Sequence, residues 1–272
     1  MTRGGGASMG HDLSLESRIR QSQLSRTCYV PMDRLEHLFL EEMLEAGLLL
    51  APMSRMYART EYWEGLTEAE RALHCMRSLQ RMHQHWVFAS VSAALAWGLD
   101  VPEEWVWPIR LATTRGNSGH GTETLLRQMV ENDAPCVVNH LRATSLGRTA
   151  LDCLRELDFE DALVLADSVL EVGAMTAEEL VAQLDSFRNT SRNSFRAMEI
   201  AGYAKNVGRQ LAPVHARMVS LGYEVPEQLD EAWIGLEKEE LEAVLDAAGV
   251  PRVPGGFALK HPDPWRPSSL NR

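Results

Sequence analysis

Residues 136–173 limit the possible folds of this chain more than any other stretch, because an extended segment there leads directly into a capped helix. The apolar residues Val137 and Leu141 are typical of a strand. Thr144 and Ser145 follow, and their hydroxyl groups can accept hydrogen bonds from the free backbone amides at a helix start. Leucines then continue near helical spacing. The segment therefore predicts a strand followed at once by a helix.

Arg148 and Asp152 lie four residues apart in this predicted helix, so both side chains project from one face. One interpretation is a pair that takes part in catalysis or binds phosphate. The other is a structural ion pair, which contributes about 0.2–0.5 kcal/mol on a helix surface and is weaker when the basic residue comes first. We favour the structural interpretation.

Five motifs follow one another along the chain: SRMYA at 54–58, SAA from Ser92, RTALD at 148–152, FEDALVLADSVL at 159–170 and TAEEL at 176–180. In combination they resemble the AbiEi-type family of antitoxins and transcriptional regulators of actinobacteria. The resemblance covers about residues 48–225. It marks a set of family-motif residues that we interpret as structural: Ser92, Arg148, Thr149, Asp152 and Asp167.

The resemblance also implies a winged DNA-binding unit near the N-terminus, closed by the strand at 54–58. Before that strand, Pro31 suits a first helical turn, and the apolar positions after it indicate an amphipathic helix that ends near Gly47. A complete helix-turn-helix needs another helix before this one, whereas residues 1–26 are polar enough to predict disorder. We therefore expect only a partial winged-helix-like module.

The net charge of −11 restricts the DNA-binding interpretation, because affinity for DNA comes largely from neutralised phosphates. Arg34, Arg55 and Arg59 are the candidate DNA-binding residues around the wing. Acidic residues lie among them, and the predicted helix over 32–46 has an acidic face that repels the DNA backbone. Two interpretations stay open: a module that contacts promoter DNA, and a degenerate module that binds a partner protein.

Many relatives in this family carry a Vsr-like endonuclease region that begins with P-x-E-S-x-x-R, and its glutamate helps to bind a catalytic magnesium ion. The matching position here is His215, which has no carboxylate. Residues 229–272 give a short acidic helix and a Pro-rich end in place of the acid-bearing strand of the nuclease. We expect a truncated or decayed nuclease region. The chain is thus predicted not to be an enzyme, with a decayed metal-dependent endonuclease as the alternative.

No motif predicts a cofactor or a metal site. The glycines of 115–122 are not followed by the lysine and hydroxyl residue of a phosphate-binding loop, and the histidines at 74–85 lack metal-ligand spacing. No apolar run approaches the roughly 20 residues that span a bilayer, and the N-terminus lacks the apolar core of a secretory signal. We expect a cytoplasmic protein with no membrane partner.

Together these observations predict an α+β protein: a partial winged-helix-like N-terminal module, a small, mostly antiparallel sheet packed by helices, and a helical C-terminal extension. Within the sheet, the resemblance implies an antiparallel pair of 124–130 with 136–143. The predicted function is a non-enzymatic, antitoxin-like transcriptional regulator, with promoter DNA and a cognate toxin protein as expected partners. The expected regions are a disordered leader (1–26), the partial module (27–66), an AbiEi-like α+β domain (67–206), a nuclease-like remnant (207–250) and a Pro-rich tail (251–272).

Overall fold

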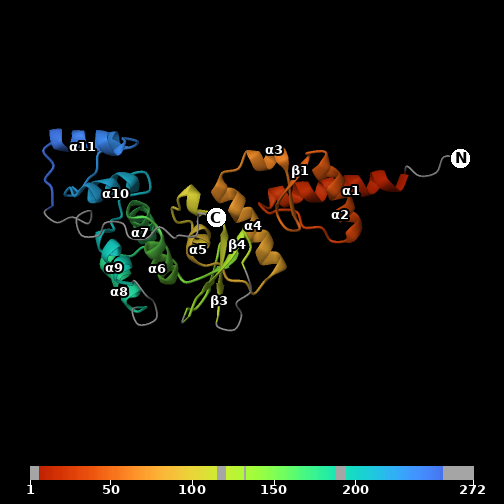
Figure 1. The fold of residues 1–272 in the computed structure, drawn as a ribbon, viewed down its shortest axis with the longest axis horizontal. Helices are drawn as coiled ribbons and strands as arrows, with labels where there is room; N and C mark the ends of the chain where they lie inside the picture. The colour runs from red at the N-terminus through yellow and green to blue at the C-terminus, as the bar shows by residue number, and fades with distance from the viewer. Residues whose placement is uncertain (1–5, 115–120, 132, 188–193, 254–272) are drawn as a thin grey trace. The chain divides into compact units, whose positions relative to one another are not determined.

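The computed structural model describes residues 6–114, 121–131, 133–187 and 194–253, with side chains from residue 15 onward. Helices predominate in this part of the chain, and its strands form three pairs (Figure 1). The predicted α+β class is therefore confirmed. Most of the loop at 115–122 and most of the Pro-rich tail lie outside the described residues.

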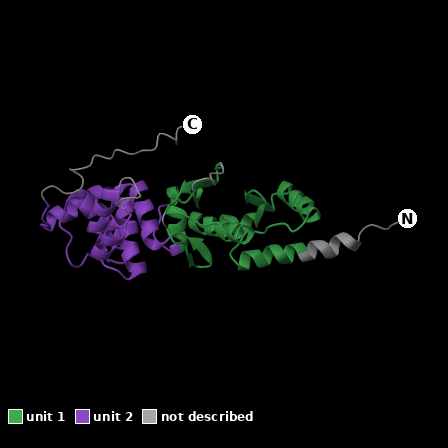
Figure 2. Ribbon diagram, turned by 90° about the horizontal axis from the view of Figure 1, so that it is seen from below, with its two compact units in different colours: residues 1–96, 103–144 green, residues 97–102, 145–272 purple. Residues whose placement is uncertain are grey.

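The chain divides into two compact units (Figure 2): residues 1–96 with 103–144 form unit 1, and residues 97–102 with 145–272 form unit 2. The boundary falls between Thr144 and Ser145, where the last strand ends and the first helix of unit 2 is capped. The region 67–206, expected as one domain, therefore contributes to both units.

The elements of unit 1 alternate between helices and short strands. Its helices are α1 (Gly6–Leu24), α2 (Arg34–Glu45), α3 (Thr60–Glu64), α4 (Glu68–Met82) and α5 (Ser90–Trp97), with a 3-10 turn at Glu103–Trp105. Its strands are β1 (Leu49–Met53), β2 (Met56–Arg59), β3 (Ile109–Thr113), β4 (Leu125–Met129), β5 (Cys136–Val138) and β6 (Leu141–Ala143).

The N-terminal leader forms a helix, so the prediction of a disordered segment over 1–26 is wrong for its described part. Leu15 and Ile19 of α1 are 1% and 2% exposed and belong to one core cluster with residues of α2, β1 and β2. These two apolar residues, four positions apart, pack α1 on the module, although so short a stripe gives no periodicity that the sequence alone would reveal.

A backbone bridge completes this N-terminal module. The amide of Tyr29 donates to the carbonyl of Tyr57 at 2.8 Å, and the amide of Tyr57 donates back to the carbonyl of Tyr29 at the same distance. Since β1 and β2 form an antiparallel hairpin, the bridge adds a short third segment beside β2. The module thus consists of a helix, a bridged segment, a second helix and a hairpin.

The strand pairing in the rest of unit 1 differs from the expected antiparallel arrangement. β4 pairs with β3 in parallel, with Ile109 opposite Leu125. Residues 136–143 do not pair with β4 as predicted, because Asn139 and His140 form a tight turn with φ values of 49° and 63°. Two consecutive left-handed residues are what a two-residue hairpin requires, so β5 and β6 pair with each other and Val137 and Leu141 belong to different strands.

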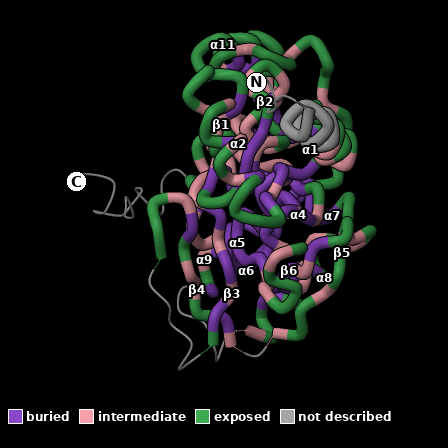
Figure 3. The backbone as a smooth tube through the Cα atoms, turned by 90° about the vertical axis from the view of Figure 1, so that its right-hand side faces the viewer, coloured by how far each residue is buried: buried purple, intermediate pink, exposed green. Residues whose placement is uncertain are grey.

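The backbone of Phe88 joins the two strand pairs. Its amide donates to the carbonyl of Arg142, and its carbonyl accepts from the amide of Thr144. On the other side, Val87 and Ala89 bond to the backbone of β3. Phe88 is fully buried. Alternate residues of β3 are buried as well, and the strand is coloured by burial in Figure 3.

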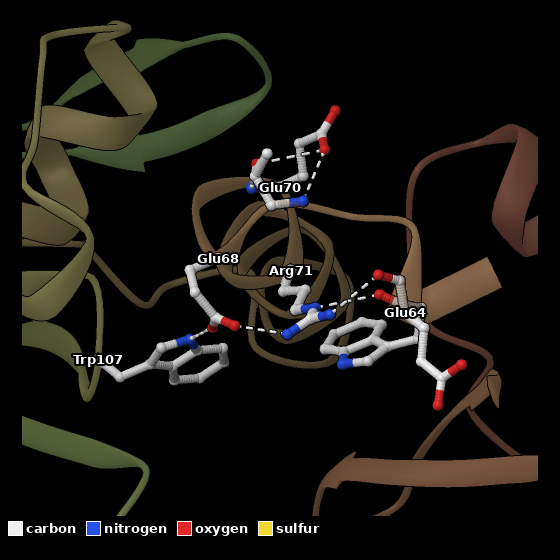
Figure 4. Close-up of polar contacts among 7 residues, drawn as sticks. Glu64, Glu68, Glu70, Arg71 and Trp107 are labelled. Carbon is white, nitrogen blue, oxygen red and sulfur yellow. Dashed lines mark hydrogen bonds and ion pairs between the residues drawn. The ribbon is translucent and has the colours of Figure 1, made fainter. Parts of the chain in front are cut away.

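A polar network fixes the start of α4 (Figure 4). Thr67 and Glu70 form a capping box, in which each side chain accepts a hydrogen bond from the other residue's backbone amide. Arg71 donates through Nε to the carbonyl of Trp63 at 3.0 Å, which ties α4 to α3. Glu68 accepts from Nε1 of Trp107 at 2.9 Å, which ties α4 to the segment before β3.

Unit 2 is helical in its described part. The predicted cap of its first helix is confirmed, since Oγ of Ser145 accepts from the amide of Arg148 at 3.2 Å. The helices are α6 (Leu146–Glu156), α7 (Phe159–Gly173), α8 (Ala177–Asp185), α9 (Ser194–Tyr203), α10 (Ala212–Leu221) and α11 (Lys238–Ala247), with a 3-10 turn at Glu231–Trp233.

No helix among the described residues is long and apolar enough to span a membrane.

The packing of α1 predicts that Ile19→Ala lowers the free energy of unfolding by about 2–5 kcal/mol, the range for emptying a buried aliphatic site. Leu24→Ala is the matched control on the same helix, because Leu24 is 74% exposed, and it should change the stability by less than about 0.5 kcal/mol. Urea unfolding of the full chain measures both. Equal effects of the two variants would show that α1 does not pack on the module.

Candidate functional site

The outward face of α2 is the most unusual surface of the N-terminal module. Leu35 and Leu38 are 62% and 51% exposed, although both are large apolar residues. Helical spacing aligns them with Glu42 and Glu45 along one stripe, and Glu41 lies beside it; all three glutamates are exposed. We call these five residues the α2 face. Its apolar part is followed by an entirely acidic part.

A buried carboxylate holds α2 in place from the opposite side. Oε2 of Glu36 accepts from the hydroxyl of Tyr29 and from the amide of Met32, both at 2.7 Å, and Arg18 of α1 forms an ion pair with the same carboxylate. Burial alone would raise the pKa of Glu36, but the hydrogen bonds from Met32, Tyr29 and Arg18 outweigh it and the pKa is lowered. The α2 face is therefore presented by a firmly anchored helix.

The three arginines predicted to contact DNA are all exposed, but they do not gather at one point. Arg34 begins α2. Arg55 lies in the turn between β1 and β2 with a φ of 61°, and Arg59 ends β2. The hairpin therefore presents one arginine at each end of β2, and the α2 face lies on a different element. DNA contact by these residues stays a prediction.

Two of the family-motif residues, Ser92 and Thr149, are buried in the core of their units. Ser92 is fully buried, and its Oγ accepts from the amide of Arg110 at 2.8 Å. Thr149 is also fully buried, and its amide donates to the carbonyl of Ser145 at 2.8 Å. Neither hydroxyl group is exposed to solvent. The sequence did not reveal the burial of Ser92 and Thr149 or the bond between Ser92 and Arg110, because these depend on which face of each helix is turned inward.

The Arg148–Asp152 pair is buried, which changes its energetics. Arg148 is 4% exposed and Asp152 is 1% exposed, and Nε of Arg148 lies 3.0 Å from Oδ2 of Asp152. Arg155 approaches the other carboxylate oxygen at 3.7 Å. The small free energy of an exposed helical pair therefore does not apply, because removal of one partner leaves a charge in a poorly solvated place.

Asp167 and His215, 48 residues apart in sequence, form a second buried pair. Oδ2 of Asp167 lies 2.6 Å from Nδ1 of His215, and Oδ1 accepts from the amide of Lys205 at 2.8 Å. Burial raises the pKa of Asp167, although the bonds from His215 and Lys205 oppose the rise. The sequence marked both positions, Asp167 as a motif residue and His215 as a substitution, but gave no reason to join them.

This pair lies at a cavity of about 1060 Å³ in unit 2, which His215 lines together with Tyr203, Lys205 and Tyr223. Nε2 of His215 has no hydrogen-bond partner among the described residues. A carboxylate on Nδ1 orients an imidazole as a base, but a nucleophilic mechanism also needs a hydroxyl or thiol on Nε2. The pair therefore lacks the third group of such a site within the described chain.

Across the described residues, no group of three or more histidine, cysteine, aspartate or glutamate side chains is arranged to hold a metal ion. Comparison of the chain with protein families, with curated proteins and with solved structures finds no match.

The burial of Asp152 predicts that Asp152→Ala lowers the free energy of unfolding by about 3–5 kcal/mol, because the buried guanidinium of Arg148 loses the carboxylate 3.0 Å from its Nε. Arg155→Ala is the control, since Arg155 is the more exposed and more distant partner, and its effect should stay below about 1 kcal/mol. Thermal and urea unfolding of the two variants measure both effects. A small effect of Asp152→Ala would show that solvent reaches the pair.

The lowered pKa of Glu36 predicts a pH-dependent effect of Glu36→Gln. A lowered folded-state pKa stabilises the protein above the unfolded-state value of about 4.3, and this stabilisation disappears as the pH falls through the folded-state pKa. The variant should therefore be less stable than the wild type by about 1–3 kcal/mol at pH 7, and the difference should shrink below about pH 4. Glu42→Gln on the exposed side of α2 is the control. A stability difference between wild type and Glu36→Gln that stays constant from pH 7 to pH 3.5 would contradict a lowered pKa of Glu36.

Proposed function

We propose that the protein is a non-enzymatic, antitoxin-like regulator whose N-terminal module acts by binding a partner protein. The observation that carries this proposal is the α2 face, where Leu35 and Leu38 are exposed beside three glutamates. Large apolar residues on an outward helix face are typical of helix-mediated protein contacts. The regulator part of the proposal rests on the resemblance of the sequence motifs.

The charge of the α2 face favours a protein partner over a DNA groove. A helix that enters the major groove passes between two phosphate backbones, and Glu41, Glu42 and Glu45 would be repelled there. A partner with an apolar pocket for Leu35 and Leu38, and with lysines or arginines beside it, complements the same face in both shape and charge. We therefore assign a basic, partly apolar protein surface as the partner.

Contact with DNA through the hairpin is a second candidate function. Arg34, Arg55 and Arg59 are exposed, and none of them forms an ion pair with a described residue. The helix expected to be missing before α2 is present as α1, so the order of helix, bridged segment, helix and hairpin is compatible with a winged-helix-like unit. Phosphate contacts of this kind position a protein on DNA without reading its sequence.

The position of His215 supports the proposal that the protein is not an enzyme. The resemblance expects a magnesium-binding glutamate at this place, and the imidazole that replaces it is fully buried and bonded to Asp167. An imidazole bound in this way does not supply the carboxylate that would hold a magnesium ion.

The test of this proposal is Leu38→Asp in the full chain, titrated calorimetrically with the protein that the neighbouring gene encodes. Because Leu38 is exposed, the variant should keep its melting temperature within a few degrees while its affinity falls at least about tenfold. Val244→Asp is the control, since it places the same charge at an exposed apolar position on a helix of unit 2. Equal affinities for wild type and Leu38→Asp would contradict the proposal.

DNA contact by the hairpin is tested by electrophoretic mobility shifts at several salt concentrations. The DNA is the region upstream of the gene that encodes this protein. If the hairpin contacts phosphates, Arg55→Ala and Arg59→Ala each weaken binding to all sequences and reduce the log–log salt slope by about one. Wild-type protein that fails to shift DNA at low salt would exclude this candidate and leave the partner-protein proposal intact.

A further inference from the structure

A hollow in unit 1 is lined by hydrogen-bond donors and by positive charge. Its volume is about 490 Å³, and no carboxylate lies among its lining residues. This composition is notable in a chain with a net charge of −11. The lining residues are Ser25, Thr27, Arg77, Gln80, Arg81, Gln84 and His140.

Arg77 and Arg81 bring like charges together on α4. They lie four residues apart and so project from one face, an arrangement that destabilises a helix unless something offsets it. Nη1 of Arg77 donates to the backbone carbonyl of Arg26 at 3.3 Å, and the charged side chain of Arg26 is close enough to repel the charge of Arg77. Burial lowers the pKa of Arg77, and the charge of Arg26 lowers it further. A bound anion would relieve this crowding.

Most N–H donors of Arg77 and Arg81 make no hydrogen bond within the described chain. Each arginine has five N–H donors, and each makes one hydrogen bond within the described chain: Arg77 to the carbonyl of Arg26, and Arg81 to Oγ1 of Thr27 at 3.3 Å. Neither forms an ion pair with a described residue. Glu70 of α4 is an acid near Arg26, but its carboxylate already accepts hydrogen bonds from Thr67 in the capping box (Figure 4).

The framework around the hollow is held by Gln80. Its Nε2 donates to the carbonyls of His83, Gln84 and Trp86, while its Oε1 accepts from the amide of Arg142 at 2.7 Å. These bonds fix the end of α4 against β6, and the β5–β6 turn places His140 among the lining residues. The arginines therefore project from a rigid support.

We propose that this hollow binds a phosphate group, held by the guanidinium groups of Arg77 and Arg81. A phosphate monoester carries about −1.5 to −2 charges at neutral pH and three acceptor oxygens, which matches two guanidinium groups better than the single charge of a carboxylate does. A small phosphorylated molecule supplies such a group. A nucleic acid backbone offers the same kind of phosphoryl oxygen, but each of its diesters carries a single negative charge, so the monoester is the better match.

The test is calorimetric titration of the full chain with pyrophosphate and with ADP at low salt, beside fluorescence anisotropy with a labelled 20-base-pair duplex. Arg81→Gln should weaken the binding of pyrophosphate about tenfold, since a charge-assisted contact is lost. Arg77→Gln should do the same. Arg20→Gln removes an equal charge from an exposed arginine of α1 that does not line the hollow, and it should leave the dissociation constant within about twofold.

The two sources of phosphate give different results, and both support the site. If Arg81→Gln weakens pyrophosphate and duplex binding alike, the hollow holds backbone phosphates. If it weakens only pyrophosphate and ADP, the ligand is a small phosphorylated molecule. Absence of binding by the wild type, or equal losses in Arg81→Gln and Arg20→Gln, would overturn the proposal. The partner-protein proposal is measured separately through Leu38, so the two can fail independently.

Discussion

The backbone of Phe88 is the constraint on which the order of unit 1 depends. One residue bonds to β6 through both its amide and its carbonyl, while its neighbours bond to β3. Since β3 carries β4 and β6 carries β5, two separate pairs become one layer. Gln80 then ties α4 to this layer through the amide of Arg142. The positions of the α4 arginines and of the β5–β6 turn both follow from this single connection.

Acidic and basic side chains of unit 1 lie on different elements and are held in different ways. Glu36 is turned inward and satisfied by three donors, so α2 can expose leucines and glutamates on its other side. Arg77 and Arg81 of α4 line a hollow and do not pair with those glutamates. An acidic chain can therefore offer one face to a basic protein and another to an anion. Net charge alone does not distinguish these two surfaces.

The sequence was sufficient where local chemistry leaves a recognisable signal. Ser145 caps α6 as predicted, because a hydroxyl residue before a run of leucines acts through its own backbone neighbours. It was insufficient where a local signal is absent or where contacts between distant residues decide. The turn at Asn139 and His140 contains no glycine, so the sequence predicts one strand where the structure has two. Leu15 and Ile19 gave no periodicity, and the burial of Asp152 depends on which face of α6 is turned inward.

The β5–β6 turn has a consequence for how this protein can tolerate change. His140 adopts a φ of 63°, a conformation that is unfavourable by about 1–2 kcal/mol for a residue with a Cβ atom and is free of strain for glycine. Glycine would thus make the hairpin more robust, yet it would remove an imidazole from the wall of the hollow. Thermal robustness and recognition are in opposition at this one position, and selection for heat resistance alone would be expected to erase the histidine.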